Sequence, residues 1–492
     1  MKNPEKLSFP ESEFMNYKII LHTLGWVLNL EAAAMTLPLI CSLIYGESNT
    51  LTFIICIGLC LLIGLPLTVR TPKKKTMYAR EGFITVTISW LVMSFVGALP
   101  FYISGTIPGF IDALFETVSG FTTTGASILN DVEILPKSII FWRSFTHWIG
   151  GMGVLVFLVA ILPLSGGNNL YLIKAESTGP AVSKLVPKVR KTAKILYLMY
   201  IGLTATEIIL LLLGNCDLFT ALTLSFGTAG TGGFGILNSS IASYSPYIQW
   251  VITIFMILFG IDFSIFYLVL LGKLKDVLHS EELRTYLFVI LSAIALITAN
   301  CFHIYENIAE TIRYASFQVA SIITTTGYST VNYDIWPEFS KVILLFLMFI
   351  GACAGSTGGG IKVSRIIILF KSISKELVTA IHPNSTKKIY LNKRPVAHEV
   401  VRAVNVYMAA YILIYAVSLL LISLDAMNFT TNFTAVAATL NNIGPGFDTV
   451  GPAGNYMNYS GFSKIIFIFD MLIGRLEIFP FLVFFSKSSW RK

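Results

Sequence analysis

The segment Ser119-Gly120-Phe121-Thr122-Thr123-Thr124-Gly125-Ala126 decides the fold, because versions of it occur three more times along the chain. The other versions are Thr231-Gly232-Gly233-Phe234, Ile323-Thr324-Thr325-Thr326-Gly327-Tyr328 and Asn441-Asn442-Ile443-Gly444-Pro445-Gly446. Taking Gly125, Gly232, Gly327 and Gly444 as equivalent glycines gives intervals of 107, 95 and 117 residues. Gly233 is an alternative to Gly232 in the second copy. A recurrence at about one hundred residues indicates an internal repeat.

These segments lie in a chain whose composition suits an apolar solvent. Of its 492 residues, 55% are hydrophobic and only 13% are charged, and the mean hydropathy is +0.73. Soluble domains carry about 25% charged residues, so the composition predicts an all-α membrane protein. A spanning helix needs about 20 mostly apolar residues. Ten runs meet this requirement: 19–45, 51–69, 82–104, 139–163, 195–214, 246–271, 285–302, 342–370, 403–424 and 465–486.

The basic residues predict the orientation of these spans. Of the 35 Lys and Arg residues, 29 fall at the two termini or in alternate loops, around 70–80, 174–194, 273–284 and 362–402. The opposite loops hold four basic residues against twelve acids. Such an asymmetry places both termini of a multi-pass protein on the cytoplasmic side of the lipid bilayer. Because the net charge of +8 is spread over several clusters, nucleic acid is not an expected partner.

Four of the outer loops contain an apolar stretch that is too short to cross a bilayer. These stretches are 110–121, 217–227, 309–323 and 431–441, and each runs into one of the Thr- and Gly-rich segments. The predicted unit is therefore a span, a short helix, a loop and a second span. This unit divides the chain into an N-terminal helix pair, 1–78, and four repeats, 79–164, 165–273, 274–371 and 372–492.

Four non-helical segments at membrane depth predict a pore. Irregular backbone is tolerated there only where protein or water covers it, and four copies around one axis cover one another. Glycine lets the backbone turn its carbonyl oxygens toward that axis. Rings of carbonyls replace the hydration shell of a monovalent cation, and the negative ends of the short helices favour the same charge. The expected fold is four repeats around one pseudo-fourfold pore.

On these motifs the chain resembles the Trk/Ktr/HKT superfamily of potassium transporters over residues 79–492. The two additional N-terminal spans make it similar to the TrkH members, and Arg143-Ser144-Phe145-Thr146-His147-Trp148-Ile149-Gly150-Gly151-Met152-Gly153 is similar to the family's first post-filter helix. The resemblance implies gated potassium uptake across a bacterial inner membrane. It implies a homodimer with one pore per subunit and a TrkA-type cytosolic nucleotide-binding regulatory subunit. The only metal expected is potassium at the filter, with no other cofactor in this chain.

The resemblance also implies which residues bind the ion. The lining carbonyls are expected just before each glycine, at Thr123-Thr124 before Gly125, Gly230-Thr231 before Gly232, Thr325-Thr326 before Gly327 and Asn442-Ile443 before Gly444. In the family, a glycine in every copy accompanies potassium selectivity. The stretch Gly227-Thr228-Ala229-Gly230 departs from the Ser or Thr that the family often carries before the second filter segment.

The eighth predicted span contains five glycines within ten residues, Gly351, Gly355, Gly358, Gly359 and Gly360. Each costs a helix about 1 kcal/mol relative to Ala, so a break is predicted. The GK[ST] ending of a phosphate-binding loop is absent, whereas Gly351-x-x-x-Gly355 also fits a helix-packing motif. Similarity to TrkH favours a gate beneath the filter, which would include Lys362.

Arg475 lies within the last predicted span, where a charge usually faces a cavity or a partner. In one interpretation, neighbouring helices simply satisfy it. In the other, Arg475 belongs to the gate: it holds the glycine-rich loop through backbone carbonyls and repels passing potassium. The family carries an arginine in this helix, which favours the second interpretation.

The alternative function is an ion-coupled secondary transporter that moves potassium with a proton or sodium, since such proteins also use repeats and broken helices. A coupled transporter needs coupling groups, and the loop glycines have no neighbouring carboxylate. An enzyme is not expected, because the sequence shows no nucleophile–base pair, metal-ligand spacing or phosphate-binding loop.

Overall fold

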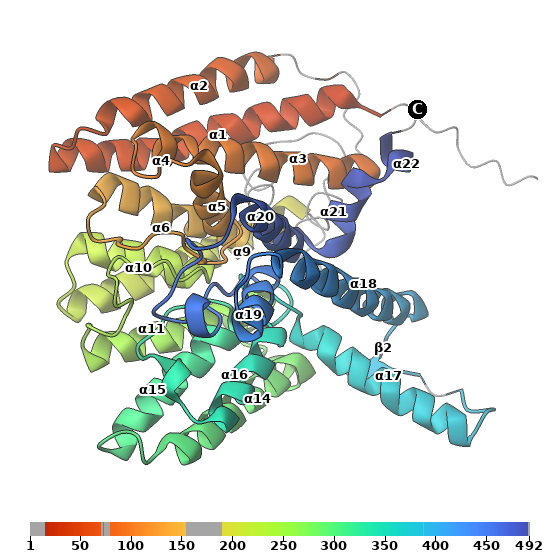
Figure 1. Ribbon diagram of the computed structural model, residues 1–492. Helices are drawn as coiled ribbons and strands as arrows, with labels where there is room; N and C mark the ends of the chain where they lie inside the picture. The colour runs from red at the N-terminus through yellow and green to blue at the C-terminus, as the bar shows by residue number, and fades with distance from the viewer. Residues whose placement is uncertain (1–14, 70–71, 73–78, 154–188, 387, 491–492) are drawn as a thin grey trace, which may run out of the picture.

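The computed structural model describes residues 15–69, 72, 79–153, 189–386 and 388–490, and the regular structure in this part of the chain is almost entirely helical (Figure 1). It begins with a hairpin of two long helices, α1 (Tyr17–Tyr45) and α2 (Thr50–Val69). A Cβ atom on Gly25 would lie 2.7 Å from the Cβ of Leu67. Small residues thus let the two backbones approach closely, as is common between membrane helices.

After this hairpin, one order of elements recurs four times: a long helix, a short helix, and a further helix that ends early or is broken. The first two sets comprise α3 (Ala79–Gly97), α4 (Leu99–Ile103), α5 (Phe110–Phe121), α6 (Lys137–Met152), α9 (Val189–Leu213), α10 (Leu218–Gly230), α11 (Pro246–Phe259), α12 (Phe263–Leu270) and α13 (Leu274–Leu278). The last two comprise α14 (Glu281–Cys301), α15 (Ile308–Ile323), η1 (Tyr333–Ile335), α16 (Glu338–Phe349), α17 (Val363–Ile381), α18 (His398–Ile422), α19 (Phe429–Leu440), η2 (Asp448–Val450), α20 (Gly461–Leu476), α21 (Ile478–Phe485) and α22 (Lys487–Trp490). A hairpin of β1 (Tyr390–Leu391) and β2 (Arg394–Pro395) precedes α18, with Tyr390 opposite Pro395.

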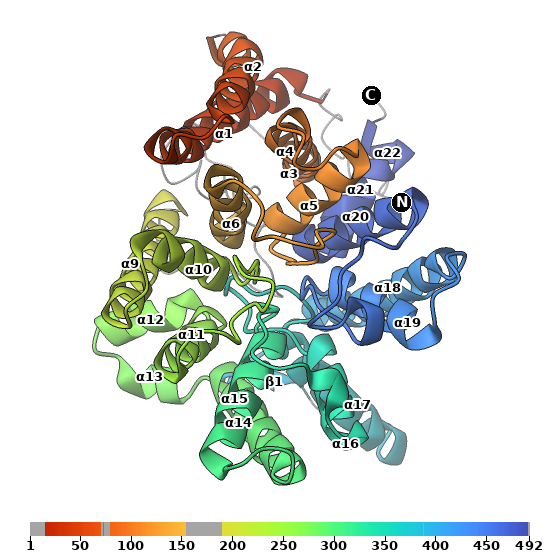
Figure 2. The ribbon, with the colours of Figure 1, turned by 60° about the vertical axis from the view of Figure 1, so that its left-hand side comes forward.

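The four short helices α5, α10, α15 and α19 form the centre of the molecule. In Figure 2 they surround the loops on the central axis in chain order. Three of them begin at a capping side chain, because Asp217, Asn307 and Asn428 each accept a hydrogen bond from a backbone N–H of the first turn. Their bounds confirm the four short helices predicted from the sequence to within three residues.

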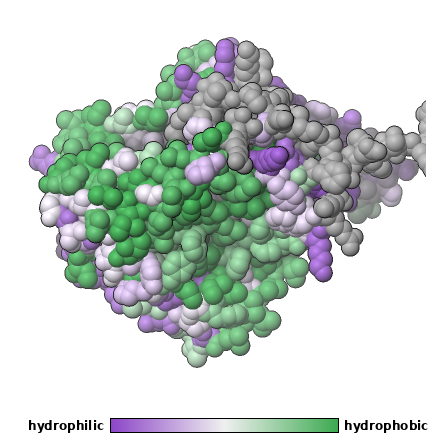
Figure 3. All heavy atoms as spheres, turned by 90° about the horizontal axis from the view of Figure 1, so that it is seen from above, coloured by the Kyte–Doolittle hydropathy of each residue, from purple (hydrophilic) through white to green (hydrophobic). Residues whose placement is uncertain are grey.

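The long helices turn apolar side chains outward. Large residues such as Leu62, Phe288 and Leu420 are at least 70% exposed, and Figure 3 shows apolar side chains over most of the face viewed. Continuous apolar surface of this kind is unfavourable in water. Because each helix satisfies its own backbone, the exposed surface suits a lipid environment.

Of the ten predicted spans only some are single unbroken helices, and the break expected in the eighth span from its five glycines is found. Among the described residues, six helices are long and apolar enough to cross a membrane: Tyr17–Tyr45, Thr50–Val69, Arg80–Ile103, Lys191–Leu213, Glu281–Cys301 and His398–Ile422. The bent pair α11 and α12, whose axes differ by 93°, meets the same test only when its two helices are taken together.

The remaining runs are interrupted, and each interruption has a local cause. Helix α6 ends where Gly153 takes a φ of 80°, and residues 154–163 of that expected span lie outside the described residues. Residues 350–362 separate α16 from α17, and Glu477, with a φ of 67°, separates α20 from α21. The hydropathy of a run does not report such backbone breaks. Much of the basic loop 174–194 likewise lies outside the described residues.

Candidate functional site

The four short helices end in the same way. In each, a backbone N–H beyond the helix donates to the carbonyl five residues earlier, over 2.8–2.9 Å. The donors and acceptors are Thr124 and Ser119, Gly232 and Gly227, Thr326 and Ser321, and Ile443 and Ala438. This bond is the one that closes a helix with a left-handed residue after it. The residues in that conformation are Thr123, Thr231, Thr325 and Asn442, with φ between 56° and 59°.

Two residues after each left-handed residue comes a glycine that also has a positive φ. These glycines are Gly125, Gly233, Gly327 and Gly444, with φ of 80°, 72°, 85° and 95°. The second copy therefore follows the alternative register, in which Gly233 and not Gly232 is the equivalent glycine. The expected lining pair Gly230-Thr231 shifts by one residue to Thr231-Gly232.

The segments that contain these glycines meet in a closed cycle, which we call the ring: residues 122–126, 230–234, 324–328 and 441–445. A Cβ added to each glycine would strike a carbonyl oxygen of another segment. The distances from that Cβ are 2.0 Å from Gly125 to Gly232 O, 1.9 Å from Gly233 to Thr326 O, 2.1 Å from Gly327 to Ile443 O, and 2.7 Å from Gly444 to Thr124 O. Each segment thus packs its glycine against the oxygen of the next, and the fourth packs against the first.

The four carbonyl oxygens in this cycle belong to buried residues. Thr124, Thr326 and Ile443 are fully buried, and Gly232 is buried too. Within the part of the chain that is described, no N–H or O–H donates to any of these four oxygens. Buried carbonyls nearly always have a partner, so the ring presents four oxygens that are available to a ligand.

A second tier of contacts closes the same cycle in the loops beyond the ring. Neighbouring loops bond through Asn238 N and Glu133 Oε1 at 2.9 Å, Ile241 N and Ser329 O at 2.9 Å, Tyr333 Oη and Gly446 O at 2.9 Å, and Tyr456 N and Ser127 O at 2.9 Å. The Asn238 amide also donates to the exposed Asp131 carboxylate over 2.8 Å and lowers its pKa. These bonds hold the four segments at one level.

The second copy has Gly230 and Gly232 where the first and third copies have threonines, and His147 occupies the space that their side chains would need. A Cβ on Gly232 would lie 2.1 Å from Nδ1 of His147, and one on Gly230 would lie 2.3 Å from the His147 carbonyl oxygen. His147 is fully buried, and its Nδ1 lies 2.8 Å from the Gly120 carbonyl oxygen. Glycines at 230 and 232 thus leave room for His147 of α6, whereas a Cβ on Gly227 would meet the Tyr328 hydroxyl.

A buried ion pair supports the first two segments from outside the ring. Arg143 Nε donates to Glu116 over 2.7 Å, and Arg143 also donates to the Gly235 carbonyl over 3.0 Å. Glu116 in turn accepts from Ile128 N over 3.0 Å and from the Ser127 hydroxyl. An isolated buried charge would be costly, whereas a pair with further hydrogen bonds is tolerated. The pair therefore connects α5, α6 and the backbone of two segments.

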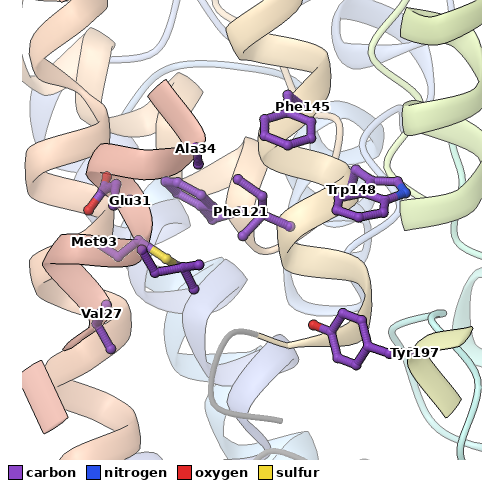
Figure 4. Close-up of a pocket in the computed structure, with 10 residues that line it drawn as sticks. Val27, Glu31, Ala34, Met93, Phe121, Phe145, Trp148 and Tyr197 are labelled. Carbon is purple, nitrogen blue, oxygen red and sulfur yellow. The ribbon is translucent and has the colours of Figure 1, made fainter. Parts of the chain in front are cut away.

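An open cavity of about 200 Å³ lies on one side of the ring, and all four aligned glycines line it. A second cavity, of about 180 Å³, lies beside the ring between the N-terminal hairpin and the first set of helices. Figure 4 shows its lining, including Met93, Phe121 and Trp148, with Glu31 as a carboxylate-bearing residue. Because its walls are mostly carbon, the second cavity offers no set of oxygens to a cation.

The glycine-rich loop lies directly against the ring. Gly359 N donates to the Thr325 hydroxyl over 2.7 Å, and a Cβ on Gly358 would lie 3.1 Å from the Thr324 carbonyl oxygen. Gly351 N bonds to Ile361 O over 2.7 Å, which draws the two ends of the break together. Gly355 and Gly360 have φ of 78° and 66°. The loop is thus folded back on itself under the third and fourth segments and is not a helix-packing surface.

Two buried cations hold this loop. Arg475 donates to the Thr357 carbonyl over 2.7 Å and to the carbonyls of Gly150 and Gly151 at the end of α6. Lys362 Nζ donates to the carbonyls of Gly358 and Gly359. These contacts fit both sequence-based interpretations, because Arg475 bonds a carbonyl of the loop and also two carbonyls at the end of the neighbouring helix α6.

Sequence reasoning missed three supporting residues. His147 and Arg143 stood in a motif that was noted, and Arg143 was recognisable as a charge within a predicted span. Glu282, described below, gave no signal because it lies at the start of a span, where charges are ordinary.

The chain is similar to known proteins over nearly its whole length. The family model TrkH, described as a cation transport protein, matches residues 46–492. The chain is 38% identical over 488 residues to the Trk system potassium uptake protein TrkH of Escherichia coli (strain K12), covering 97% of this chain and 100% of that protein. It is 32% identical over 480 residues to the Trk system potassium uptake protein TrkG of the same strain, covering 96% and 99%. The crystal structure of the potassium transporter TrkH from Vibrio parahaemolyticus superposes with a TM-score of 0.87 at 32% identity, covering 97% and 100% of the two chains.

The ring contacts predict that Gly327→Ala destabilises the protein. A left-handed φ costs an L-residue about 1–2 kcal/mol, and the clash with Ile443 O adds about 1–3 kcal/mol of overpacking. Gly105→Ala is the matched control, because Gly105 has a φ of 73° with nothing within 4 Å of the added Cβ. Thermal unfolding in detergent should show the larger loss for Gly327→Ala, and equal losses would contradict the packing described.

The register of the second copy has its own test. Gly232→Ala should lower the unfolding temperature, and the loss should shrink in a His147→Ala background, because the obstructing ring is gone. Gly233→Ala should be equally harmful in both backgrounds, since it meets the Thr326 backbone. If His147→Ala instead restores the unfolding temperature of Gly233→Ala and not that of Gly232→Ala, the register first expected from the sequence is supported.

Proposed function

Because the chain belongs to the TrkH family of cation transport proteins, and is therefore a transporter and not an enzyme, we propose that it takes up potassium through a gated pore. The selectivity filter of this pore is the ring, with the carbonyls of Thr124, Gly232, Thr326 and Ile443 among its ion ligands. The observation that carries the proposal is that four carbonyl oxygens of buried residues share one closed cycle and have no donor among the described residues.

The chemistry of these oxygens suits a large monovalent cation. Carbonyl dipoles replace the hydration shell of potassium without adding a formal charge that would trap it. The C-terminal ends of α5, α10, α15 and α19 lie next to the ring and add partial negative charge. A glycine at each aligned position is needed, because any Cβ would displace a neighbouring carbonyl. The four-part filter thus accounts for the four Thr- and Gly-rich segments.

The glycine-rich loop is proposed as the gate, composed of Gly351, Gly355, Gly358, Gly359, Gly360 and Lys362, with Arg475 as its anchor. The loop lies against the third and fourth segments of the ring, and it brings Lys362 and Arg475 close to the path an ion would take. A fixed positive charge near a dehydrated cation raises the energy of passage, more so where water is scarce. In this arrangement the loop closes the pore by its bulk and by its charge.

We further propose a multi-pass location in the bacterial cell membrane with both termini cytoplasmic, as the distribution of basic residues indicates. The proposed partners are a second copy of the chain and a cytosolic nucleotide-binding regulator of the TrkA type. A homodimer would keep one pore in each subunit, since the four segments of a single chain already close the cycle. The four-repeat division with boundaries at 79, 165, 274 and 372 follows the same recurrence.

Rubidium uptake into liposomes that contain the purified protein tests the proposed function. We expect saturable uptake that potassium blocks and that an equal concentration of sodium inhibits much less. Proton movement in a fixed ratio to rubidium would support the ion-coupled transporter instead. An absence of rubidium uptake in open-gate variants would contradict the pore.

Neutralising the proposed anchor should open the gate. Arg475→Gln removes the donors to Thr357, Gly150 and Gly151, and deletion of 355–360 shortens the loop itself. Both should raise rubidium flux in the absence of a regulator by about threefold or more. Arg313→Gln is the control, since Arg313 pairs with Glu310 in the first two turns of α15, at the end of that helix away from the ring. Flux at the wild-type level in both gate variants would remove the gating proposal.

A further inference from the structure

A single carboxylate holds both ends of the break in which the glycine-rich loop lies. Oε1 of Glu282 accepts from Ala354 N over 2.7 Å and from Ser364 N over 3.1 Å. Ala354 belongs to the loop, whereas Ser364 is the second residue of α17. The nine residues 355–363, which include the three glycines closest to the ring, lie between the two points that this oxygen joins.

The side chain of Glu282 is well placed to act as a fixed support. It is the second residue of α14, whose start is capped by Ser280, which accepts from Leu283 N. The neighbouring Glu281 is attached to the cytoplasmic hairpin, because its backbone N–H donates to the Asn392 side chain over 2.7 Å. Glu281 also pairs with Lys371 of α17. The end of α14 is thus held from two sides, and Glu282 projects from it onto the loop.

Loss of this support would leave the loop held by fewer bonds on both sides of Ala354. Two bonds to the bend between α11 and α12 would remain, from Cys353 N to Gly260 O over 3.0 Å and from the Thr357 hydroxyl to Phe259 O over 3.2 Å. The N–H groups of Ala354 and Ser364 would lose the acceptor that they have in the structure. An unsatisfied first turn weakens the start of a helix, so α17 and the loop would loosen together.

We propose that Glu282 is a positioning residue that keeps the glycine-rich loop in its closed arrangement by joining Ala354 to Ser364. The proposal rests on the proposed function of the loop as a gate. What matters is the position of one acceptor oxygen, not the charge of the group. Movement of α14 relative to α17 would release the loop. The β1–β2 hairpin bonds to Glu281, the residue of α14 next to Glu282.

Three variants separate the position of the oxygen from its charge. Glu282→Gln keeps an oxygen at the same reach and removes the charge, so its rubidium flux without a regulator should stay within about twofold of wild type. Glu282→Asp keeps the charge but ends one methylene short, and Glu282→Ala has no acceptor, so both should raise flux about fivefold or more. Glu338→Gln is the control, because Glu338 is an exposed glutamate in the first turn of α16, at the end of that helix away from the loop.

A second measurement reports on the loop itself. Cys353 lies in the loop and is fully buried, so its modification by a maleimide, followed by peptide mass spectrometry, should be slow in wild type and in Glu282→Gln. It should be at least five times faster in Glu282→Ala and Glu282→Asp. The ratio of rubidium to sodium flux should not change, because the ring contacts are untouched. A general loss of structure would change this ratio and would also affect Glu282→Gln.

The outcomes distinguish this inference from the proposed function. If neither the wild-type protein nor the Arg475→Gln variant binds or conducts rubidium, the proposed pore is wrong. A conducting wild type with unchanged flux and a protected Cys353 in both Glu282→Asp and Glu282→Ala would overturn only the role of Glu282. If Glu282→Ala does not fold, Glu282→Asp decides the question. If Glu282→Gln behaves like Glu282→Ala, charge and not position holds the loop, and the inference is wrong.

Discussion

The structure depends on the contact between a glycine and the carbonyl oxygen of the next segment, repeated until it closes on itself. At each of the four contacts a side chain would come within about 2–3 Å of that oxygen, closer than real Cβ atoms approach. The glycine therefore sets the spacing of the ring, and the helix ends set the direction of its carbonyls. Everything outside the ring, from the capped short helices to the bonded outer loops, keeps these four backbone segments at one level.

The helices that follow the four ring segments are all interrupted close to the ring. After each ring segment the following helix ends or breaks: α6 at Met152, α11 at Phe259, α16 at Phe349 and α20 at Leu476. The breaks meet beneath the ring, where Arg475 joins the fourth set of helices to the first and to the glycine-rich loop of the third. Backbone carbonyls freed by broken helices need donors in an apolar environment, and the buried cations supply them. A gate of the proposed kind needs a loop that a few hydrogen bonds hold in place and that can move when those bonds break.

The sequence predicted the elements that recur and not those that occur once. The four short helices and their Thr- and Gly-rich ends were predictable, because four copies at similar intervals reinforce one another. The register at Gly232 and Gly233 was not, since two adjacent glycines look alike until the φ of Thr231 and the position of His147 are known. The spans at 246–271 and 465–486 were predicted as continuous because hydropathy does not report a bend. The pairing of Glu116 with Arg143 joins residues 27 positions apart, and nothing in their local sequence specifies it.

In the proposed pore, the carbonyls of Thr124, Gly232, Thr326 and Ile443 surround a dehydrated potassium ion. An anomalous difference map of crystals grown in rubidium locates this ion, because rubidium scatters anomalously and has nearly the size of potassium. We expect a peak on the axis of the ring, within coordination distance of these four oxygens. Rubidium located elsewhere, with no peak inside the ring, would contradict the proposed pore.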